Sequence, residues 1–244
     1  MIKVEEINAL TLFVEKRSIV VPGEVLAEGK YILGANTYLK NGKIYASKLG
    51  LFDFTQDKLM VVPFKGAYIP NVNDQVIGKI IDVGLSGWIV DIASPYEALL
   101  PASEIQDKRS KIKIDLTKIL DLGDLILAKV AAFDRTRDPL LTIKEEGLGR
   151  ITSGKIVEIP PTKIPRLIGK KGSMINMLKK ETECEIYVGQ NGVVLVSGKN
   201  PFNENLAIEA INKIAAEAHT QGLTDRIKEM IKKRREEYAS GKTN

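Results

Sequence analysis

Short apolar runs separated by turn residues fill the first 65 positions of the chain. SIVV, YILG, KIYA and KLMVV have the length and the β-branched content of strands, and glycine, asparagine or aspartate residues lie between them. Asn41 and Gly42 separate TYLK from KIYAS, and Asn-Gly favours the type I′ turn of a hairpin, which needs positive φ at both central positions. Residues 1–65 are therefore predicted to form a small β-rich N-terminal domain, a scaffold that docks on partner subunits.

A second strand pattern covers residues 66–147. Apolar runs follow one another from DQVIGKIIDVG to PLLTIKEE, and a long basic stretch separates the third run from the fourth. Five strands with one long connection suit an OB-type β-barrel.

The spacing of apolar residues changes after Gly154. A strand (KIVEIP) is followed by a short helix at 165–168, a second helix from Ser173, two strands (CEIYV and VVLVSG) and a longer helix at 203–218. This β-α-α-β-β-α order defines a third domain over residues 148–221. Residues 222–244 are predicted to be a basic C-terminal helix and tail, which either packs one apolar stripe or contacts RNA. The fold class is multidomain α+β.

The segment LIGKKG, residues 167–172, carries the clearest chemistry in the chain. Gly169 and Gly172 have no Cβ, so the main chain can approach a phosphodiester closely. Lys170 and Lys171 add positive charge, and the helix that starts at Ser173 directs free N–H groups and the positive end of its dipole to the same place. The segment therefore predicts a clamp for the phosphate backbone of RNA.

The same Gly-x-x-Gly spacing occurs at residues 84–87 (GLSG) and 189–192 (GQNG). Both segments lie between strand-like runs and carry no positive charge. They are predicted to be turns or hairpin connections.

The order of elements after Gly154, together with LIGKKG, resembles a type I KH domain, and LIGKKG matches the signature of that family without a departure. The resemblance implies RNA contacts from a set of residues around the loop: Arg166, Ile168, Gly169, Lys170, Lys171, Gly172, Ser173 and Ile186. It also implies that bases rest on an aliphatic wall built from Ile164, Leu167, Ile168, Ile175 and Ile186.

VDIASPYEALLPASEI and GDLILAKV resemble an S1 RNA-binding domain, an OB barrel that binds single strands with a basic groove and aromatic platforms. The chain departs from that family at Ser86 and Ile89, where aromatic residues are usual. Trp88 should point away from Ile89, and it is either a core or domain-contact residue or a stacking surface for bases. The basic candidates for RNA contact, whose alternative is a solvated edge, are Lys108, Arg109, Lys111, Lys113, Arg135 and Arg137.

Composition narrows the chemistry further. The net charge of +5 suits a polyanionic partner without requiring one. The single histidine, His219, is predicted to cap a helix end, and the single cysteine, Cys184, to lie in a core strand. Asp121 and Asp124 are interpreted as turn residues. Zinc hydrolases, Ser-His-Asp triads and Cys-His nucleophiles need partners that are missing here, so we expect no catalytic residues, no metal and no cofactor.

The sequence also bears on location. No apolar run reaches the roughly 18 residues of a membrane span, and the first residues lack the features of a signal peptide. We expect a soluble cytoplasmic protein without membrane contact.

The order of the domains, an N-terminal β domain, an S1-like barrel and one KH domain, resembles the cap subunit of the archaeal exosome that carries S1 and KH modules. VVPGEVLAEG and GANTYLKNGKIYASKLG resemble the N-terminal domain of that family. The resemblance implies a non-catalytic subunit, present in three copies on a ring of RNase PH-like subunits. It would capture single-stranded, A-rich RNA and guide the 3′ end through a central pore for 3′-to-5′ degradation.

Two other functions use the same residues differently. A nuclease acting on its own is disfavoured by the missing catalytic groups. A translation or transcription factor with S1 and KH modules fits the RNA-binding chemistry equally well, and the residues alone leave it open.

Overall fold

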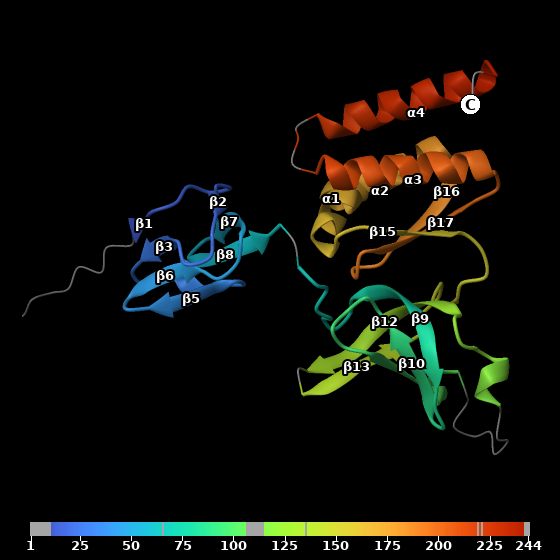
Figure 1. Cartoon of the computed structure of the whole chain (residues 1–244), viewed down its shortest axis with the longest axis horizontal. Coiled ribbons are helices and arrows are strands. Elements are labelled where there is room, and N and C mark those ends of the chain that lie inside the picture. The colour runs from blue at the N-terminus through green and yellow to red at the C-terminus, as the bar shows by residue number, and fades with distance from the viewer. Residues whose placement is uncertain are drawn as a thin grey trace, which may run out of the picture. The chain divides into compact units, whose positions relative to one another are not determined.

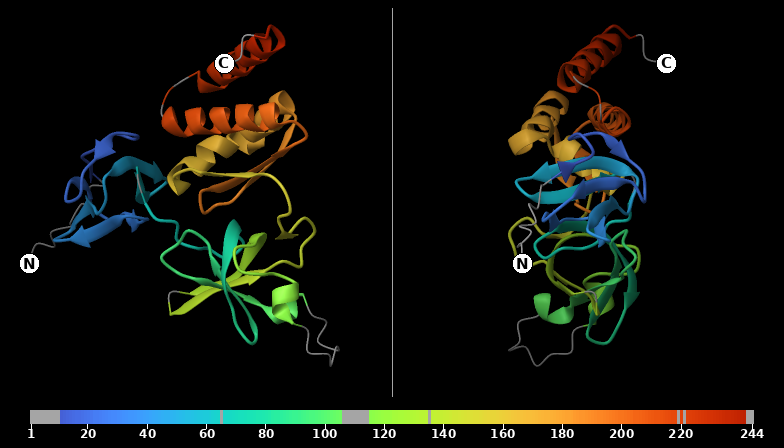
Figure 2. Two further views of the ribbon diagram at one scale, coloured as in Figure 1. Left: turned by 45° about the vertical axis from the view of Figure 1, so that its right-hand side comes forward. Right: turned by 90° about the vertical axis from the view of Figure 1, so that its left-hand side faces the viewer.

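The computed structural model describes residues 11–64, 66–105, 115–134, 136–218, 220 and 222–241. The chain divides after Gly66 into two compact units. Figures 1 and 2 show the first unit in colours from blue to cyan, and the second unit runs from teal to red.

The described strands of the first unit form two four-stranded sheets, in the orders β1-β3-β6-β5 and β2-β7-β8-β4. The strands are β1 (Thr11–Leu12), β2 (Ile19–Val20), β3 (Val25–Glu28), β4 (Ile32–Leu33), β5 (Thr37–Lys40), β6 (Lys43–Ala46), β7 (Gly50–Thr55) and β8 (Lys58–Pro63). Asn41 and Gly42 have φ of 51° and 76° and join β5 to β6, so the predicted hairpin is confirmed.

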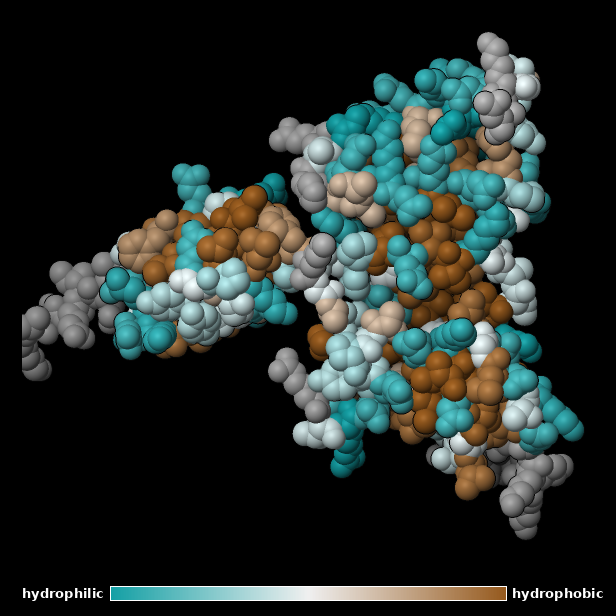
Figure 3. Space-filling view, in the orientation of Figure 1, coloured by the Kyte–Doolittle hydropathy of each residue, from teal (hydrophilic) through white to brown (hydrophobic). Residues whose placement is uncertain are grey.

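The first unit has a small core and an unusually apolar surface. Val20, Leu26 and Phe52 are fully buried, whereas large side chains such as Ile19 and Leu39 are 64% and 57% exposed. Figure 3 shows hydrophobic side chains gathered over part of this unit. An apolar surface of this kind is typical of a domain that binds another protein.

The first part of the second unit is a β-barrel. Its strands are β9 (Gln75–Val83), β10 (Gly87–Asp91), β11 (Ala98–Pro101), β12 (Leu125–Asp134), β13 (Arg137–Thr142) and the short β14 (Gly149–Arg150). The sheet closes because β13 pairs with both β11 and β12. The connection from β11 to β12 contains the 3₁₀ turns η1 (Ala102–Glu104) and η2 (Leu116–Lys118). The predicted five-stranded OB barrel is confirmed, with β14 added from the segment that follows it.

Trp88 lies inside the barrel. Its side chain is completely buried, and its Nε1 donates a hydrogen bond to the carbonyl oxygen of Leu120 at 2.8 Å. Ile89 points to the outer face, as the alternation along a strand predicts. Trp88 is therefore a core residue and is not a stacking surface for bases.

The last part of the second unit is a three-stranded sheet, ordered β15-β17-β16, with helices on one face (Figure 1). Its strands are β15 (Lys155–Glu158), β16 (Cys184–Val188) and β17 (Val193–Gly198), and its helical elements are η3 (Pro161–Lys163), α1 (Ile164–Ile168), η4 (Lys170–Gly172), α2 (Ser173–Thr182), α3 (Pro201–Ala216) and α4 (Leu223–Ala239). This is the predicted KH order, and Cys184 lies in the core as expected.

Helix α4 belongs to the core of the KH domain. Leu223, Ile227 and Ile231 recur at helical spacing, and each is at most 1% exposed. They join the same hydrophobic cluster as the residues of α3. The packing interpretation of the C-terminal helix is confirmed.

The turn between β16 and β17 joins the KH domain to the barrel. Asn191 is 2% exposed, and its Nδ2 donates to the carbonyl oxygens of Ile77 at 2.8 Å and Ile92 at 2.9 Å. An apolar cluster of Ile77, Leu127, Val193 and Leu195 lies beside these bonds. The sequence correctly predicted GQNG to be a hairpin connection, but gave no sign that it docks two domains.

Replacing Asn191 by alanine should lower the free energy of unfolding of the second unit by about 2–6 kcal/mol. Two buried carbonyl groups would lose their donor, and each unsatisfied group costs roughly 1–3 kcal/mol. Asn191→Asp, which keeps the shape but removes the N–H donors, should cost at least as much. Chemical denaturation of the full chain measures both effects.

The matched control is Asn205→Ala. Asn205 is exposed and accepts a hydrogen bond from Lys155, so its loss should change the free energy of unfolding by no more than about 0.5 kcal/mol. If the Asn191 variants were no less stable than this control, the docking role of Asn191 would be refuted.

Candidate nucleic-acid interface

The LIGKKG segment spans the junction between α1 and α2. Gly169 has φ of 74° and ψ of 175°, and Gly172 has φ of 79°, which are backbone conformations that favour glycine. A Cβ on Gly169 would lie 2.8 Å from the Cβ and the backbone nitrogen of Met174. The tight approach of the chain at Gly169 therefore excludes any side chain.

The two lysines between these glycines are exposed. Neither forms an ion pair with any residue in the described part of the chain. Lys171 has φ of 53° and ψ of 33°, the left-handed conformation that costs a non-glycine residue roughly 1–2 kcal/mol. The turn thus keeps a strained backbone and two unneutralised cations at one place, a combination typical of binding sites.

The amino end of α2 points into the same turn. Gly172 is the N-cap residue, and no side chain of the described residues caps the helix. The first N–H groups of a helix have no partner within it. Together with the helix dipole they provide donors for an anion beside Lys170 and Lys171.

The residues that flank the turn contribute in different ways. Arg166 donates from Nη2 to the carbonyl oxygen of Thr220 at 3.4 Å, and its buried Nε has no hydrogen-bond partner among the described residues. Ile168 and Ile175 pack against the core but remain partly exposed. Ser173 is exposed as the first residue of α2. The predicted site residues around the loop are therefore brought together.

Ile186 and most of the predicted aliphatic wall require a correction. Ile164 and Leu167 are completely buried, and Ile186 is 2% exposed. Ile186 faces the helices together with Cys184, because residues of β16 alternate between the two faces of the sheet. These side chains form the core and offer almost no surface to a base, so only Ile168 and Ile175 remain as aliphatic contacts.

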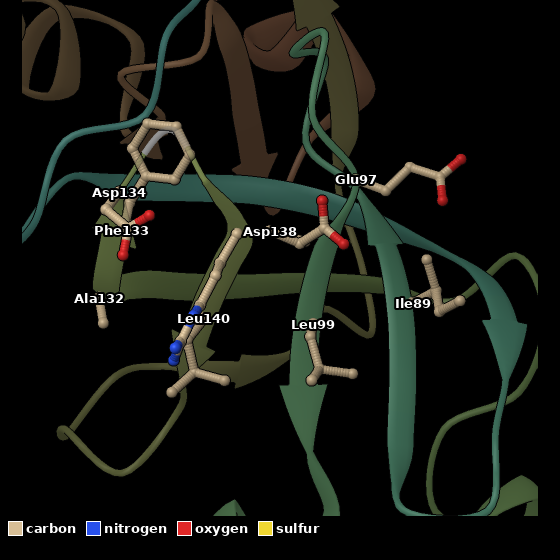
Figure 4. Close-up of a pocket in the computed structure, with 10 residues that line it drawn as sticks. Ile89, Glu97, Leu99, Ala132, Phe133, Asp134, Asp138 and Leu140 are labelled. Carbon is tan, nitrogen blue, oxygen red and sulfur yellow. The ribbon is translucent and has the colours of Figure 1, made fainter.

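The outer face of the barrel carries a separate cavity of about 460 Å³ (Figure 4). Ile89, Leu99 and Leu140 lie side by side on β10, β11 and β13. Hydrogen bonds from the hydroxyl and the backbone N–H of Thr136 lower the pKa of Asp134, so this carboxyl stays ionised.

The charge on this cavity does not resemble that of the loop at LIGKKG. Glu97, Asp134 and Asp138 line it together with Arg137. Arg137 is the one predicted S1 contact with RNA that falls among the described residues. Carboxylates outnumber cations around it. The other predicted S1 contacts, which lie outside the described residues, are Lys108, Arg109, Lys111, Lys113 and Arg135. RNA binding by the S1 candidates remains a prediction.

Two kinds of feature are missing from the described part of the chain. No group of three or more His, Cys, Asp or Glu side chains there could hold a metal ion. No helix in the described ranges is long and apolar enough to cross a membrane.

Family profiles match the three domains in order. The N-terminal domain of the exosome RNA-binding protein RRP4 matches residues 17–65, the S1 domain of RRP4 matches residues 67–132, and the KH domain matches residues 154–213. The exosome complex component Rrp4 of Thermofilum pendens is 45% identical over 93% of this chain and 98% of that protein. The chain belongs to the Rrp4 family.

Other relatives agree. Rrp4 of Pyrococcus furiosus is 47% identical over 90% of this chain and 84% of that protein. A crystal structure of a protein described as an exosome complex RNA-binding protein is 46% identical, with a TM-score of 0.64 over 70% of this chain and 98% of the other. The predicted exosome family and the multidomain fold are confirmed. Rrp4 is described as an RNA-binding component, which agrees with the prediction of a subunit that is not an enzyme.

Because Lys171 is strained, replacing it by glycine should affect stability and RNA binding in different directions. Lys171→Gly removes the strain of the left-handed conformation, roughly 1–2 kcal/mol. It also makes the unfolded chain more flexible, which lowers the free energy of unfolding by roughly 0.5–1 kcal/mol. The free energy of unfolding should therefore stay equal or rise by up to about 1.5 kcal/mol, while RNA affinity falls because a cation is lost. Denaturation and fluorescence anisotropy with labelled single-stranded RNA measure the two effects.

Lys170→Gly is the matched control, because Lys170 has no positive φ. It loses the same charge without relieving strain, so it should lower the free energy of unfolding by roughly 0.5–1 kcal/mol. Equal destabilisation by both substitutions would mean that Lys171 is not strained.

Proposed function

We propose that this Rrp4-family chain is the RNA-capturing subunit of an exosome cap. Three copies sit on a hexameric ring of RNase PH-like subunits. Each copy holds single-stranded RNA and guides its 3′ end through a central pore to the nuclease sites of the ring. The chain itself performs no chemistry.

The observation that carries this proposal is the exposed pair Lys170 and Lys171, unpaired within the described chain, at the uncapped start of α2. Charge-assisted hydrogen bonds to phosphate are stronger than neutral ones. A KH loop of this kind clamps about four nucleotides through their backbone. Such a site accepts many sequences, as a subunit that supplies a degradation machine must.

Base preference would come from the few side chains that reach the bases. Ile168 and Ile175 offer aliphatic surface, which does not read the hydrogen-bonding edges of bases. We propose that the chain favours A-rich strands only weakly, through stacking and strand flexibility.

The N-terminal domain is the part that we propose docks on the ring. Ile19, Leu51 and Val62 lie opposite one another on β2, β7 and β8, and so share one face of a sheet. Ile19 is 64% exposed and Val62 is 43% exposed. Covering such a row with a partner protein would remove apolar surface from water, the main driving force of association.

Several copies around one opening would compensate for weak individual sites. A strand that is bound to one clamp is held at high effective concentration near the others, so overall affinity rises without new contacts. This arrangement also allows release of each clamp in turn, which movement of the strand requires.

The clamp is tested by reversing its charge. Lys170→Asp combined with Lys171→Asp should lower affinity for single-stranded RNA by about 100- to 10,000-fold, because each of the two charged hydrogen bonds contributes roughly 1.5–3 kcal/mol. The slope of log affinity against log salt should fall by about 1.4, since each neutralised phosphate of a single strand contributes roughly 0.7. Anisotropy titrations over a range of salt concentrations measure both quantities.

The control is Lys40→Asp combined with Lys58→Asp, two exposed lysines of the first unit. This pair changes the net charge by the same amount but should leave affinity nearly unchanged. If the two double variants bound RNA equally well, the clamp would not be the RNA site.

Assembly is tested by native mass spectrometry of complexes captured from cell extract on the tagged full chain. Ring subunits in a three-to-six ratio are expected, whereas ribosomal or polymerase subunits would indicate a translation or transcription factor. Ile19→Asp combined with Val62→Asp should abolish capture of the ring. Leu85→Asp, at a fully exposed position of the barrel, is the control that should not.

A further inference from the structure

A second cavity lies where the barrel meets the KH sheet. Its volume is about 290 Å³, and its walls are the connecting segment 147–153, β12 of the barrel, and β16 and β17 of the KH domain. The cavity faces the side of the KH sheet that the helices leave open. The Asn191 turn and the apolar cluster beside it dock the two domains that form its walls.

Tyr187 is the aromatic residue of this cavity. It lies on β16 and points away from the helices, with 37% of its surface exposed. Lys179 of α2 reaches around the edge strand and places its Nζ 5.4 Å from the centre of the Tyr187 ring. The same Nζ lies 3.2 Å from Oε2 of Glu185.

Lys179 connects this cavity to residues 169–172 of LIGKKG, the GKKG loop. It lies on the helix that begins at the loop with Ser173. At about 1.5 Å per residue it is about 9 Å from the start of the helix. A strand that leaves the loop along α2 therefore meets a cation and then the ring of Tyr187 at the edge of the sheet.

The other walls suit a nucleobase. Leu127 and Leu195 provide an aliphatic floor, while Ser153 and Ser197 place hydroxyl groups at the rim. Glu185 adds a carboxylate that can only accept hydrogen bonds, as the amino groups of bases donate them. The volume is at the lower end of the range for ligand sites, which suits one base.

Charge at the rim favours a nucleotide over an acidic peptide or a neutral ligand. Arg150 is anchored by Asp124 at 2.8 Å but remains 52% exposed. Lys179 places a second cation next to the ring of Tyr187. Cations beside an aromatic ring are the combination with which proteins hold single-stranded nucleic acid.

We propose that this junction cavity is a second RNA site, which takes one base of the strand held by the GKKG loop and stacks it on Tyr187. The proposal rests on the proposed function, since it assumes that RNA is bound at the loop. RNA then follows α2 and wraps around the edge of β16. The docked arrangement of barrel and KH domain would thus be part of the binding site.

The test compares the full chain and its variants on a tetranucleotide, which fills only the loop, and on a decanucleotide. Tyr187→Ala should weaken decanucleotide binding by about 5- to 150-fold, the range that follows from losing one base–aromatic stack. Tetranucleotide affinity should change by less than about twofold. Tyr187→Phe, which keeps the ring, should bind the decanucleotide as well as the unchanged protein.

Tyr38→Ala is the matched control, because Tyr38 is 39% exposed on the first unit and should not affect either RNA. Unchanged decanucleotide affinity in Tyr187→Ala, or an equal loss for both RNAs, would overturn the proposal. Failure of the proposed function looks different, because Lys170→Asp with Lys171→Asp would then leave tetranucleotide binding intact.

Photocrosslinking tests the junction site without any substitution in the protein. A decanucleotide that carries 4-thiouridine at each position in turn is bound to the unchanged protein, irradiated and mapped by mass spectrometry. Crosslinks to Tyr187 or to residues 148–153 support the junction site. Crosslinks confined to other parts of the chain would refute it.

Discussion

The hydrogen bonds between Asn191 and the barrel carbonyls of Ile77 and Ile92 hold the second unit together as one body. A buried amide in an apolar cluster is unfavourable unless its polar atoms are satisfied. Only the docked arrangement of barrel and KH domain supplies these particular partners. This side chain, together with the apolar cluster beside it and the backbone hydrogen bond from Gln190 to Gln75, sets the position of the GKKG loop relative to the barrel and encloses the cavity between the two domains.

In the GKKG loop, backbone conformation favours glycine, whereas binding of an anion favours lysine. Gly169 is required because the chain passes within contact distance of Met174. Lys171 occupies a conformation that would suit glycine better. A lysine at that position adds a cation to the turn at the expense of local stability. The fold can tolerate this because α1 and α2 are anchored by fully buried residues such as Leu167 and Leu178.

The sequence was sufficient to predict those features of the fold that depend on residues close together in the chain. The Asn41-Gly42 turn, the opposite directions of Trp88 and Ile89 and the position of LIGKKG between two helices all follow from local propensity and alternation. Ile186 was misplaced because its strand was known but not the face that the helices cover. The role of Asn191 was missed because its partners are about a hundred residues away in the sequence. A polar residue in a turn normally indicates solvent, and only the long-range packing shows otherwise.

The distribution of charge explains why a protein of this design would need more than one contact with its ligand. The net charge is only +5, and several cations of the KH domain lie in ion pairs, such as Arg234 with Glu209 and Arg235 with Glu183. The GKKG loop itself supplies only two cations, Lys170 and Lys171, so its phosphate contacts are few and affinity per site is modest. A base held on Tyr187 would add binding energy that salt does not screen. Additional copies of the chain would raise overall affinity further while each contact stays easy to break. Moderate, renewable contacts suit a strand that must be held and also allowed to move.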